Sequence, residues 1–193
     1  MTVNGKKKNH FEKGNQVKIE WRGKSESVVH LEMDGTDTTV VGQFKCGERY
    51  GEWRRFYDNN QIKTIAHYTA GKYDGTYKIY DKSGYLKETG TYNNGNLEGI
   101  TTYFYPSGKI KAKVPFTGDE KNGTTTGYYE NGNIKYTEER KNNTICCEAK
   151  DYYENGKIEI IAHYNDEGKF DGVFKSYREN GNLKFDRIYK DGK

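Results

Sequence analysis

The stretch Gly75–Glu98, GTYKIYDKSGYLKETGTYNNGNLE, decides the fold of this chain. Polar and apolar residues alternate on both sides of the Ser83-Gly84 pair, which is the pattern of two β-strands joined by a tight turn. A two-residue turn of type I′ needs a positive φ at both central residues, a conformation that Gly and Asn adopt readily. A second Gly-containing turn at Asn94-Gly95 follows the second strand. The stretch therefore predicts a β-hairpin that leads directly into another one.

The same pattern recurs along the chain with a period of 24 residues. Further copies begin at Gly51, Gly99, Gly123 and Cys147, the last with one inserted residue, and a truncated copy begins at Gly172. Repetition at a fixed period is typical of proteins in which each unit packs on its neighbours. The equivalent tight turns are expected at Asn59-Asn60, Ser107-Gly108, Asn131-Gly132, Asn155-Gly156 and Asn180-Gly181.

The predicted fold class is all-β. We expect an elongated, twisted ribbon of tandem β-hairpins of about 24 residues each, in an open single-layer or solenoid-like sheet. Residues 51–193 are predicted to form about six of these repeats in one continuous array. Residues 1–50 keep the spacing only weakly and are predicted to form two degenerate or capping repeats, because terminal repeats must close a stack.

Alternation along the strands predicts which side chains are buried. On the second strand of one repeat, Ile62, Ala66 and Tyr68 are expected on one face. These side chains are expected to stack between neighbouring hairpins, because a lone hairpin is only marginally stable in water. On the first strands, one equivalent position is aromatic in every repeat: Phe56, Tyr80, Phe104, Tyr128, Tyr152 and Tyr177.

The composition fits this interpretation. The chain has 193 residues with 18 Tyr, 23 Gly and only 2 Pro, and its net charge is +4. Disordered chains lack aromatic residues, whereas this chain uses tyrosine as its main apolar material. The three cysteines show no metal-binding spacing and are expected to be free thiols. No apolar leader or membrane-length apolar run is visible, so we expect a cytoplasmic protein.

The repeats resemble a known family. Both GTYKIYDKSGYLKETGTYNNGNLEG and YYENGKIEIIAHYNDEGKFDG are similar to the MORN-repeat variant of bacterial proteins, whose units share the opening Gly, the Tyr pair, the Gly-x-(Leu/Ile)-Lys turn and a late aromatic. The resemblance extends from Gly51 to the C-terminus. It implies a β-hairpin scaffold or binding surface. Bacterial members are often labelled antitoxin-like or immunity proteins, and other MORN proteins are associated with membranes or anionic lipids.

Two residues depart from the family pattern. Arg140 stands where the late aromatic is expected, and Cys147 replaces the opening Gly. The segment EERKNNTICCEAK is therefore predicted to break the ladder of strands locally.

Residues with catalytic or metal-binding chemistry are few. The sequence contains no GxSxG, phosphate-binding loop, HExxH or calcium-loop pattern. His67 and His163 occupy equivalent repeat positions and are interpreted as surface histidines beside a packed tyrosine. Cys146 and Cys147 are interpreted as unreactive buried thiols. We therefore expect a protein that is not an enzyme and has no cofactor or metal.

Two rows of surface residues remain as candidates for binding a partner. A Lys row occupies one repeat position, with Glu159 as its exception, and a Tyr row occupies another. Such rows can simply cover a sheet and protect it from aggregation, or they can form a docking strip. The predicted partner-binding residues are Tyr57, Tyr105, Tyr129, Tyr153, Lys63, Lys87, Lys111, Lys135 and Arg140.

The leading functional hypothesis is a non-catalytic scaffold that binds a protein. Its narrower form, drawn from the family resemblance, is an antitoxin, immunity protein or inhibitor that occludes a toxin or other target. A rigid surface loses little ordering entropy on binding. The alternative is a peripheral binder of anionic membrane lipid through the Lys row. Nucleic acid is a less favoured partner, because Glu follows the Tyr pair in two repeats.

Overall fold

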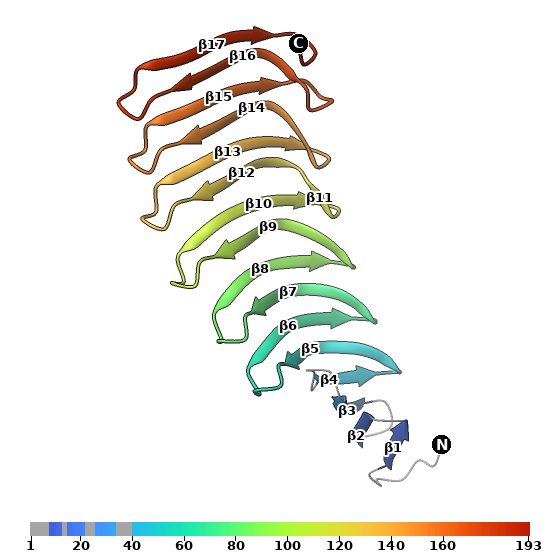
Figure 1. Cartoon of the computed structure of the whole chain (residues 1–193). Coiled ribbons are helices and arrows are strands. Elements are labelled where there is room, and N and C mark those ends of the chain that lie inside the picture. Colours follow the sequence, from blue (N-terminus) through green and yellow to red (C-terminus); the bar gives the residue numbers. More distant parts are fainter. Residues whose placement is uncertain (1–7, 13–14, 22–25, 34–39) are drawn as a thin grey trace. The chain divides into compact units, whose positions relative to one another are not determined.

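The computed structural model describes residues 8–12, 15–21, 26–33 and 40–193, with side chains from Val40 onward. The chain divides into two compact units, residues 1–96 and 97–193. All regular elements in the described part are β-strands, seventeen in all (Figure 1). The all-β prediction is confirmed. The two degenerate repeats predicted for residues 1–50 fall largely outside the residues whose side chains are described, and they stay a prediction.

The first unit consists of consecutive antiparallel strands. Each strand pairs with the next one in the chain, from β1–β2 through β7–β8. The predicted chain of hairpins is therefore present here. Its strands are β1 (Lys8–Glu12), β2 (Asn15–Trp21), β3 (Glu26–Met33), β4 (Val40–Lys45), β5 (Glu48–Phe56), β6 (Ile62–Thr69), β7 (Lys72–Tyr80) and β8 (Leu86–Asn93).

The second unit follows the same plan. Strand β9 pairs with β10, β10 pairs with β12 and with the short β11, and β12 to β17 pair in chain order. The strands are β9 (Asn96–Phe104), β10 (Ile110–Thr117), β11 (Glu120–Lys121), β12 (Gly123–Tyr128), β13 (Ile134–Lys141), β14 (Thr144–Tyr152), β15 (Ile158–Tyr164), β16 (Phe170–Tyr177) and β17 (Leu183–Tyr189).

Two kinds of turn alternate along the chain. Inside a repeat, the Gly84 N–H donates to the Asp81 carbonyl at 3.0 Å, and of the central pair only Gly84 has a positive φ, 89°. This is a type I turn followed by one left-handed residue, so the prediction of type I′ turns is wrong at these sites. Type I′ geometry occurs instead at turns between repeats such as Asn94-Gly95, whose φ values are 50° and 98°. The Gly95 N–H then donates to the Tyr73 carbonyl at 2.7 Å, which ties this turn to the start of β7. The turn at Asn165–Gly168 is an exception, because only Gly168 has a positive φ there.

In each of the six repeats from β5–β6 to β16–β17, the hairpin carries one extra residue on its second strand. In the β5–β6 ladder, Arg55 pairs with Thr64 but Phe56 pairs with Ile62, so Lys63 has no counterpart. The extra residue is the lysine of the Gly-x-(Ile/Leu)-Lys motif, which therefore encodes a left-handed turn residue followed by a β-bulge. The equivalent extra residues are Lys87, Lys111, Lys135, Glu159 and Lys184.

The bulge changes which side chains share a face. An extra residue reverses the alternation of a strand, so Ile62 and Ala66 point to opposite faces. The prediction that Ile62 lies on the same face as Ala66 and Tyr68 is wrong for this reason. Ile62 instead lies opposite Phe56, and the same pairing of an aliphatic with an aromatic residue recurs in the hairpins β7–β8, β9–β10, β12–β13, β14–β15 and β16–β17.

The opening glycine of each repeat has a structural reason. Gly51 pairs with the late aromatic Tyr68, and Gly75 pairs with Tyr92. These glycines adopt φ values of 69° and 106°, which L side chains rarely adopt.

Cys147 replaces this glycine without breaking the sheet. It pairs with Tyr164 and takes a φ of 61°. Strands β13 and β14 remain paired from Tyr136↔Asp151 to Lys141↔Thr144. The predicted local break is present only as a β-bulge: Cys147 and Glu148 have no counterparts on β13, and pairing continues on both sides of them.

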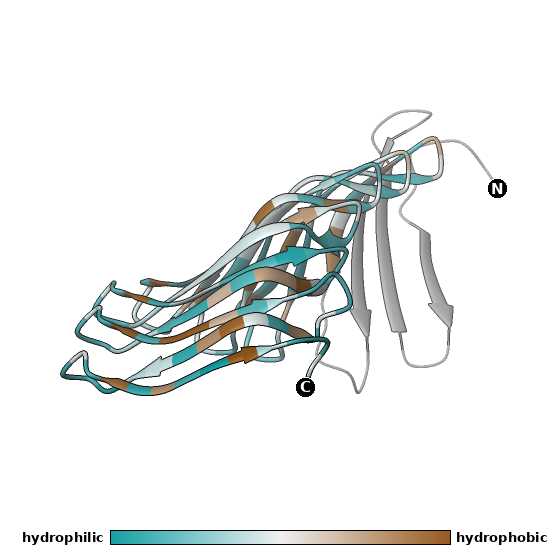
Figure 2. Cartoon of the chain, turned by 90° about the horizontal axis from the view of Figure 1, so that it is seen from above, coloured by the Kyte–Doolittle hydropathy of each residue, from teal (hydrophilic) through white to brown (hydrophobic). Residues whose placement is uncertain are grey.

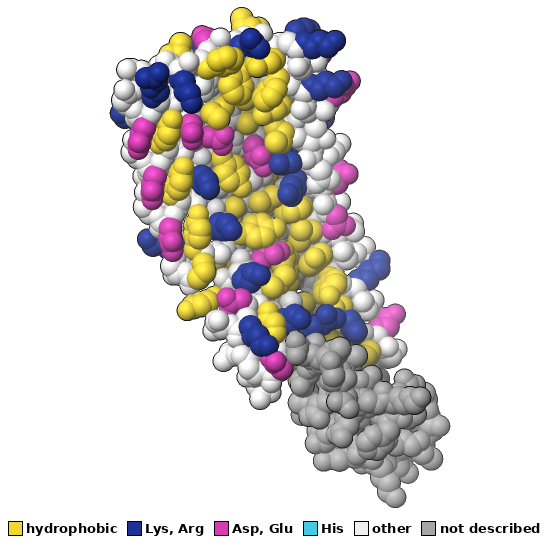
Figure 3. All heavy atoms as spheres, in the orientation of Figure 1, with side chains coloured by type: hydrophobic (Ala, Val, Ile, Leu, Met, Phe, Trp, Pro, Cys, Tyr) yellow, Lys and Arg dark blue, Asp and Glu magenta, His cyan; other side chains and the backbone are white. Residues whose placement is uncertain are grey.

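The core of each unit is shallow, and hydropathy changes repeatedly along the strands (Figure 2). On the face shown in Figure 3, hydrophobic side chains gather across successive strands, with charged side chains of both signs among and beside them. In the second unit the buried side chains are Thr101, Ala112, Val114, Phe116, Thr125, Cys146 and Ala162. Among residues 40–96 of the first unit they are Val40, Trp53, Ala66, Tyr68 and Tyr77, and all five line one groove.

Candidate functional site

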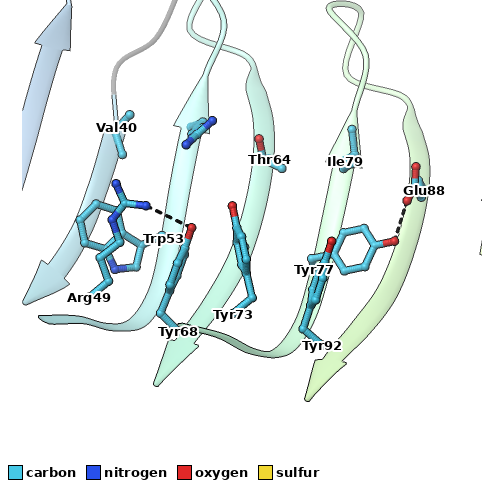
Figure 4. Close-up of a pocket in the computed structure, with 12 residues that line it drawn as sticks. Val40, Arg49, Trp53, Thr64, Tyr68, Tyr73, Tyr77, Ile79, Glu88 and Tyr92 are labelled. Atoms are coloured by element: carbon cyan, nitrogen blue, oxygen red, sulfur yellow. Dashed lines mark hydrogen bonds between the residues drawn. The ribbon is translucent and has the colours of Figure 1, made fainter. Parts of the chain in front are cut away.

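The groove in the first unit is the candidate functional site. It has a volume of about 420 Å³ and is built from strands β4 to β8 (Figure 4). Pockets of this size, apolar and with few polar groups, are typical binding sites. The lining residues are Val40, Arg49, Trp53, Arg55, Thr64, Ala66, Tyr68, Tyr73, Tyr77, Ile79, Glu88 and Tyr92.

A row of aromatic rings forms much of the groove. The Tyr68 and Tyr73 ring centroids are 4.4 Å apart, and Tyr73 and Tyr92 stack at 5.0 Å. Trp53 meets the Tyr68 ring edge to face at 5.9 Å. Because the rings of Tyr68, Tyr73 and Tyr92 stand side by side, they offer edges and hydroxyl groups to the groove (Figure 4). Such ring pairs contribute about 0.5–1.5 kcal/mol each, so the row is held in place before any partner arrives.

Positive charge is concentrated on β5. The Arg49 guanidinium lies 4.8 Å from the Trp53 ring centroid and donates a hydrogen bond to the Tyr68 hydroxyl at 3.3 Å. Arg55 lines the same groove, is exposed, and has no ion-pair partner among residues 40–193. On β8, the Glu88 carboxylate accepts a hydrogen bond from the Tyr77 hydroxyl at 2.6 Å. The β5 side of the groove is therefore suited to an anionic group.

The Tyr68 hydroxyl of the groove is a neutral donor and acceptor. Burial raises the pKa of Tyr68 to about 12, and its hydrogen bond with Tyr73 acts in the same direction. The Arg49 guanidinium lowers this pKa by a smaller amount. Tyr68 therefore remains protonated throughout the neutral range, and the Arg49 charge stays available for a bound anion.

Sequence reasoning found only part of this site. The late aromatic Tyr68 was expected on a buried face, and it does line the groove, as does the equivalent Tyr92. Arg49, Trp53 and Tyr73 were missed, because the bulges in each ladder decide which first-strand residues face inward. One sequence signal could have found Tyr73. A late aromatic such as Tyr68 pairs with the opening Gly51 on one neighbouring strand and with Tyr73, at the start of the next repeat, on the other.

The predicted Tyr row connects neighbouring hairpins. Each of its hydroxyls donates to a backbone carbonyl of the next repeat, as Tyr129 does to Tyr152 at 2.6 Å. The other three bonds are Tyr57 to Tyr80 at 2.9 Å, Tyr105 to Tyr128 at 2.6 Å and Tyr153 to Tyr177 at 2.8 Å. All four rings are half-buried. The row thus has a role in holding repeats together, and its role in partner binding stays a prediction.

The predicted Lys row lies beside the Tyr row. The ammonium groups of Lys63, Lys111 and Lys135 lie 5.2, 5.9 and 5.6 Å from the ring centroids of Tyr57, Tyr105 and Tyr129. Lys87 belongs to a repeat with Asp81 at the Tyr position. The β-bulge and the neighbouring tyrosine ring therefore determine where these lysines lie. Their role in partner binding also stays a prediction.

Arg140 lies where the late aromatic stands in other repeats, since it pairs with the opening Gly123. Its Nε is 2.8 Å from the Glu138 carboxylate, and its guanidinium donates to the Asn143 carbonyl at 2.6 Å. Both members of the ion pair are mostly buried, at 20% and 19% exposure. Arg140 is therefore engaged within its own unit and lies outside the groove.

The two equivalent histidines make the same contacts in the two units. Nδ1 of His67 lies 2.9 Å from the Thr76 carbonyl, and Nδ1 of His163 lies 3.0 Å from the Val173 carbonyl. Among residues 40–193, no group of three or more His, Cys, Asp or Glu side chains could hold a metal ion.

The model of the MORN repeat variant matches the chain at residues 49–70, 73–94, 97–117, 121–142, 148–166 and 170–191. The chain belongs to the MORN repeat variant family. Two of the matched MORN repeats form the groove together with Val40 of β4, and four lie in the second unit. No curated protein matches the chain.

MORN repeats commonly bind proteins or membranes, and the family is a repeat scaffold that is generally non-catalytic. Within the described residues there is no helix long and apolar enough to cross a membrane.

Proposed function

We propose that this protein is a non-catalytic scaffold that binds a segment of another protein in the groove of its first unit. The aromatic row between Trp53 and Tyr92, with two arginines beside it, carries this proposal. Tyr, Trp and Arg are the residues most enriched among binding hot spots. The rings are already packed against one another, so little side-chain entropy is lost when a partner binds.

The groove suggests the chemistry of the bound segment. Aliphatic or aromatic side chains would pack against the apolar lining, such as Ala66 and Ile79, and displace water from it. A carboxylate of the segment would pair with Arg55, whose guanidinium has no ion-pair partner among residues 40–193. The partner is therefore a protein with an exposed segment that combines apolar residues with Asp or Glu.

The narrower part of the proposal concerns the biological role that this binding serves. A scaffold that covers a partner's active surface would act as an antitoxin, immunity protein or other inhibitor in the cytoplasm. The support for this form is the protein-binding character of MORN repeats together with a preformed groove.

Binding to anionic lipid through the Lys row is less well supported. Three of the row's ammonium groups lie over tyrosine rings, and Glu159 stands at the same repeat position. Acidic side chains also lie among the basic ones (Figure 3). A lipid-binding surface gains about 1 kcal/mol per lysine near the membrane, and interleaved carboxylates offset that gain.

The test compares partner capture by groove variants. Arg55→Glu reverses an exposed groove charge, Tyr73→Ala removes a half-buried ring of the row, and Arg178→Glu makes the same charge change outside the groove. We expect the protein retained by the wild-type chain and by Arg178→Glu to be lost from both groove variants, at about 0.3 M salt, where exposed charges are screened.

Two results would overturn the proposal. One is equal retention of the partner by all four proteins. The other is retention only of anionic vesicles, with loss at high salt and upon Lys63→Glu, Lys111→Glu and Lys135→Glu substitution. Circular dichroism of each variant shows whether it has kept the β-fold.

A further inference from the structure

Two adjacent thiols on β14 face each other, independently of the groove. The Cys147 thiol donates to the Cys146 sulfur, with the two Sγ atoms 3.3 Å apart. Adjacent residues of a regular strand point to opposite faces, so neighbouring thiols normally lie apart. All three cysteines in the chain are free.

The β-bulge explains this unusual approach. Glu138 pairs with Ala149 and Glu139 pairs with Cys146, so Cys147 and Glu148 have no counterparts on β13. Cys147 takes a φ of 61° there, in place of the glycine of the other repeats. This left-handed turn of the backbone brings its side chain to the side of Cys146. The glycine at the same position in the other repeats has no side chain that could contact the preceding residue.

The two thiols differ in accessibility. Cys146 is 4% exposed, whereas Cys147 is exposed to solvent, so the interpretation of both as buried thiols is wrong for Cys147. Burial raises the pKa of Cys146 to about 11, and the carboxylates of Glu139 and Asp166 act in the same direction. The Lys141 ammonium is paired with Asp166 at 3.2 Å and also interacts electrostatically with both thiols. Cys147 is therefore the thiol that meets a reagent first, and Cys146 is the one held beside it.

We propose that Cys146 and Cys147 form a reversible redox site that closes to a vicinal disulfide by exchange with a small-molecule disulfide such as oxidised glutathione. The site is separate from the groove, and it does not depend on the proposed function.

The exchange proceeds in two balanced steps. The Cys147 thiolate attacks one sulfur of the glutathione disulfide, forms a mixed disulfide and releases one glutathione thiolate, which takes up a proton. The Cys146 thiol then loses its proton and attacks the Cys147 sulfur, which forms the Cys146–Cys147 bond and releases the second glutathione. The two cysteines are oxidised by two electrons, and glutathione disulfide is reduced to two thiols.

The closed form is easily reduced. Adjacent Cα atoms are about 3.8 Å apart, below the usual range of about 4.4–6.8 Å for a disulfide. The ring is therefore strained, and strained, exposed disulfides are those that open at mild potentials. Such a pair responds to changes in the thiol–disulfide balance and does not stabilise the fold permanently.

The test treats the folded chain with oxidised glutathione, alkylates the remaining thiols and maps them by tandem mass spectrometry. Cys46 is exposed and has no neighbouring cysteine, so it serves as an internal control that keeps a glutathione adduct. We expect the Cys146–Cys147 peptide to lose two hydrogens, to carry no adduct and to resist alkylation. Dithiothreitol should restore both thiols.

Two variants separate the steps. In Cys146→Ser the second step is blocked, so Cys147 should keep its glutathione. In Cys147→Ser the exposed thiol is gone, and Cys146 should stay unmodified while the chain is folded. The proposal is overturned by a stable adduct on Cys147 of the wild-type chain, or by two alkylated thiols at this site when Cys46 carries its adduct. If Cys146→Ser does not fold, the wild-type chain and Cys147→Ser still decide between these outcomes.

Discussion

A glycine with an aromatic ring across it offers the sharpest test of the packing. Gly127 is buried on β12 and pairs with Tyr136 on β13. A Cβ at this position would lie 2.5 Å from Cδ1 of the Tyr136 ring, against 3.4–4 Å for ordinary contact. The φ of Gly127 is not in the left-handed region, so the backbone itself would accept alanine. The glycine is needed for space alone.

The expected cost of Gly127→Ala follows from this clash. The ring of Tyr136 must leave its place, and overpacking of this kind costs about 1–3 kcal/mol. In a Tyr136→Ala background the clash is absent. Alanine then only reduces the freedom of the unfolded chain, which stabilises a protein by about 0.4–1 kcal/mol. The sign of the Gly127→Ala effect should therefore reverse between the two backgrounds.

The assay is urea unfolding of the four members of this double-mutant cycle, followed by circular dichroism. Gly99→Ala is a matched control, because nothing lies near its Cβ but its φ is 76°. It should cost about 1 kcal/mol through backbone strain with or without Tyr136. An equal cost of Gly127→Ala in both backgrounds would refute the reasoning.

Three further predictions concern the repeats. Tyr129→Phe removes the hydroxyl bond to the Tyr152 carbonyl and should lower the free energy of unfolding by about 1 kcal/mol in urea titration. Cys147→Gly removes a side chain from a left-handed φ of 61° and should raise the free energy of unfolding by about 0.5–1 kcal/mol. A loss of stability would show that the cysteine is not strained. Burial and the Glu159 carboxylate raise the pKa of Asp151 above its usual 3.8, so stability falls as pH rises through the folded-state pKa. Asp151→Asn should therefore raise the melting temperature at neutral pH and leave it unchanged well below pH 3.8; a shift of equal size at both pH values would contradict this.

The architecture was predictable because it depends on local signals that repeat. Alternation, turn residues and a fixed period specify hairpins, and each repeat confirms the assignment of the others.

The groove was less predictable, because bulges cannot be read from alternation. The lysine of the turn motif was interpreted as a surface residue, and its role as the extra residue of a bulge reverses the faces of Ile62 and Ala66. The turn type was also missed. A type I turn followed by one left-handed residue and a type I′ turn with two left-handed residues both favour Gly and Asn, so composition does not distinguish them. The approach of Cys146 to Cys147 depends on the left-handed φ of Cys147, which stands at the repeat position that is otherwise a positive-φ glycine. Alternation alone places the two thiols on opposite faces.

The most direct test of the central claim is hydrogen–deuterium exchange of the chain with and without its captured partner. We predict that protection upon binding is strongest in the peptides that line the groove, Arg49–Ala66 and Tyr73–Tyr92, and is unchanged in the second unit. Protection confined to the turns that carry Tyr105, Tyr129, Lys111 and Lys135 would contradict the groove as the binding site and would assign binding to the Tyr and Lys rows.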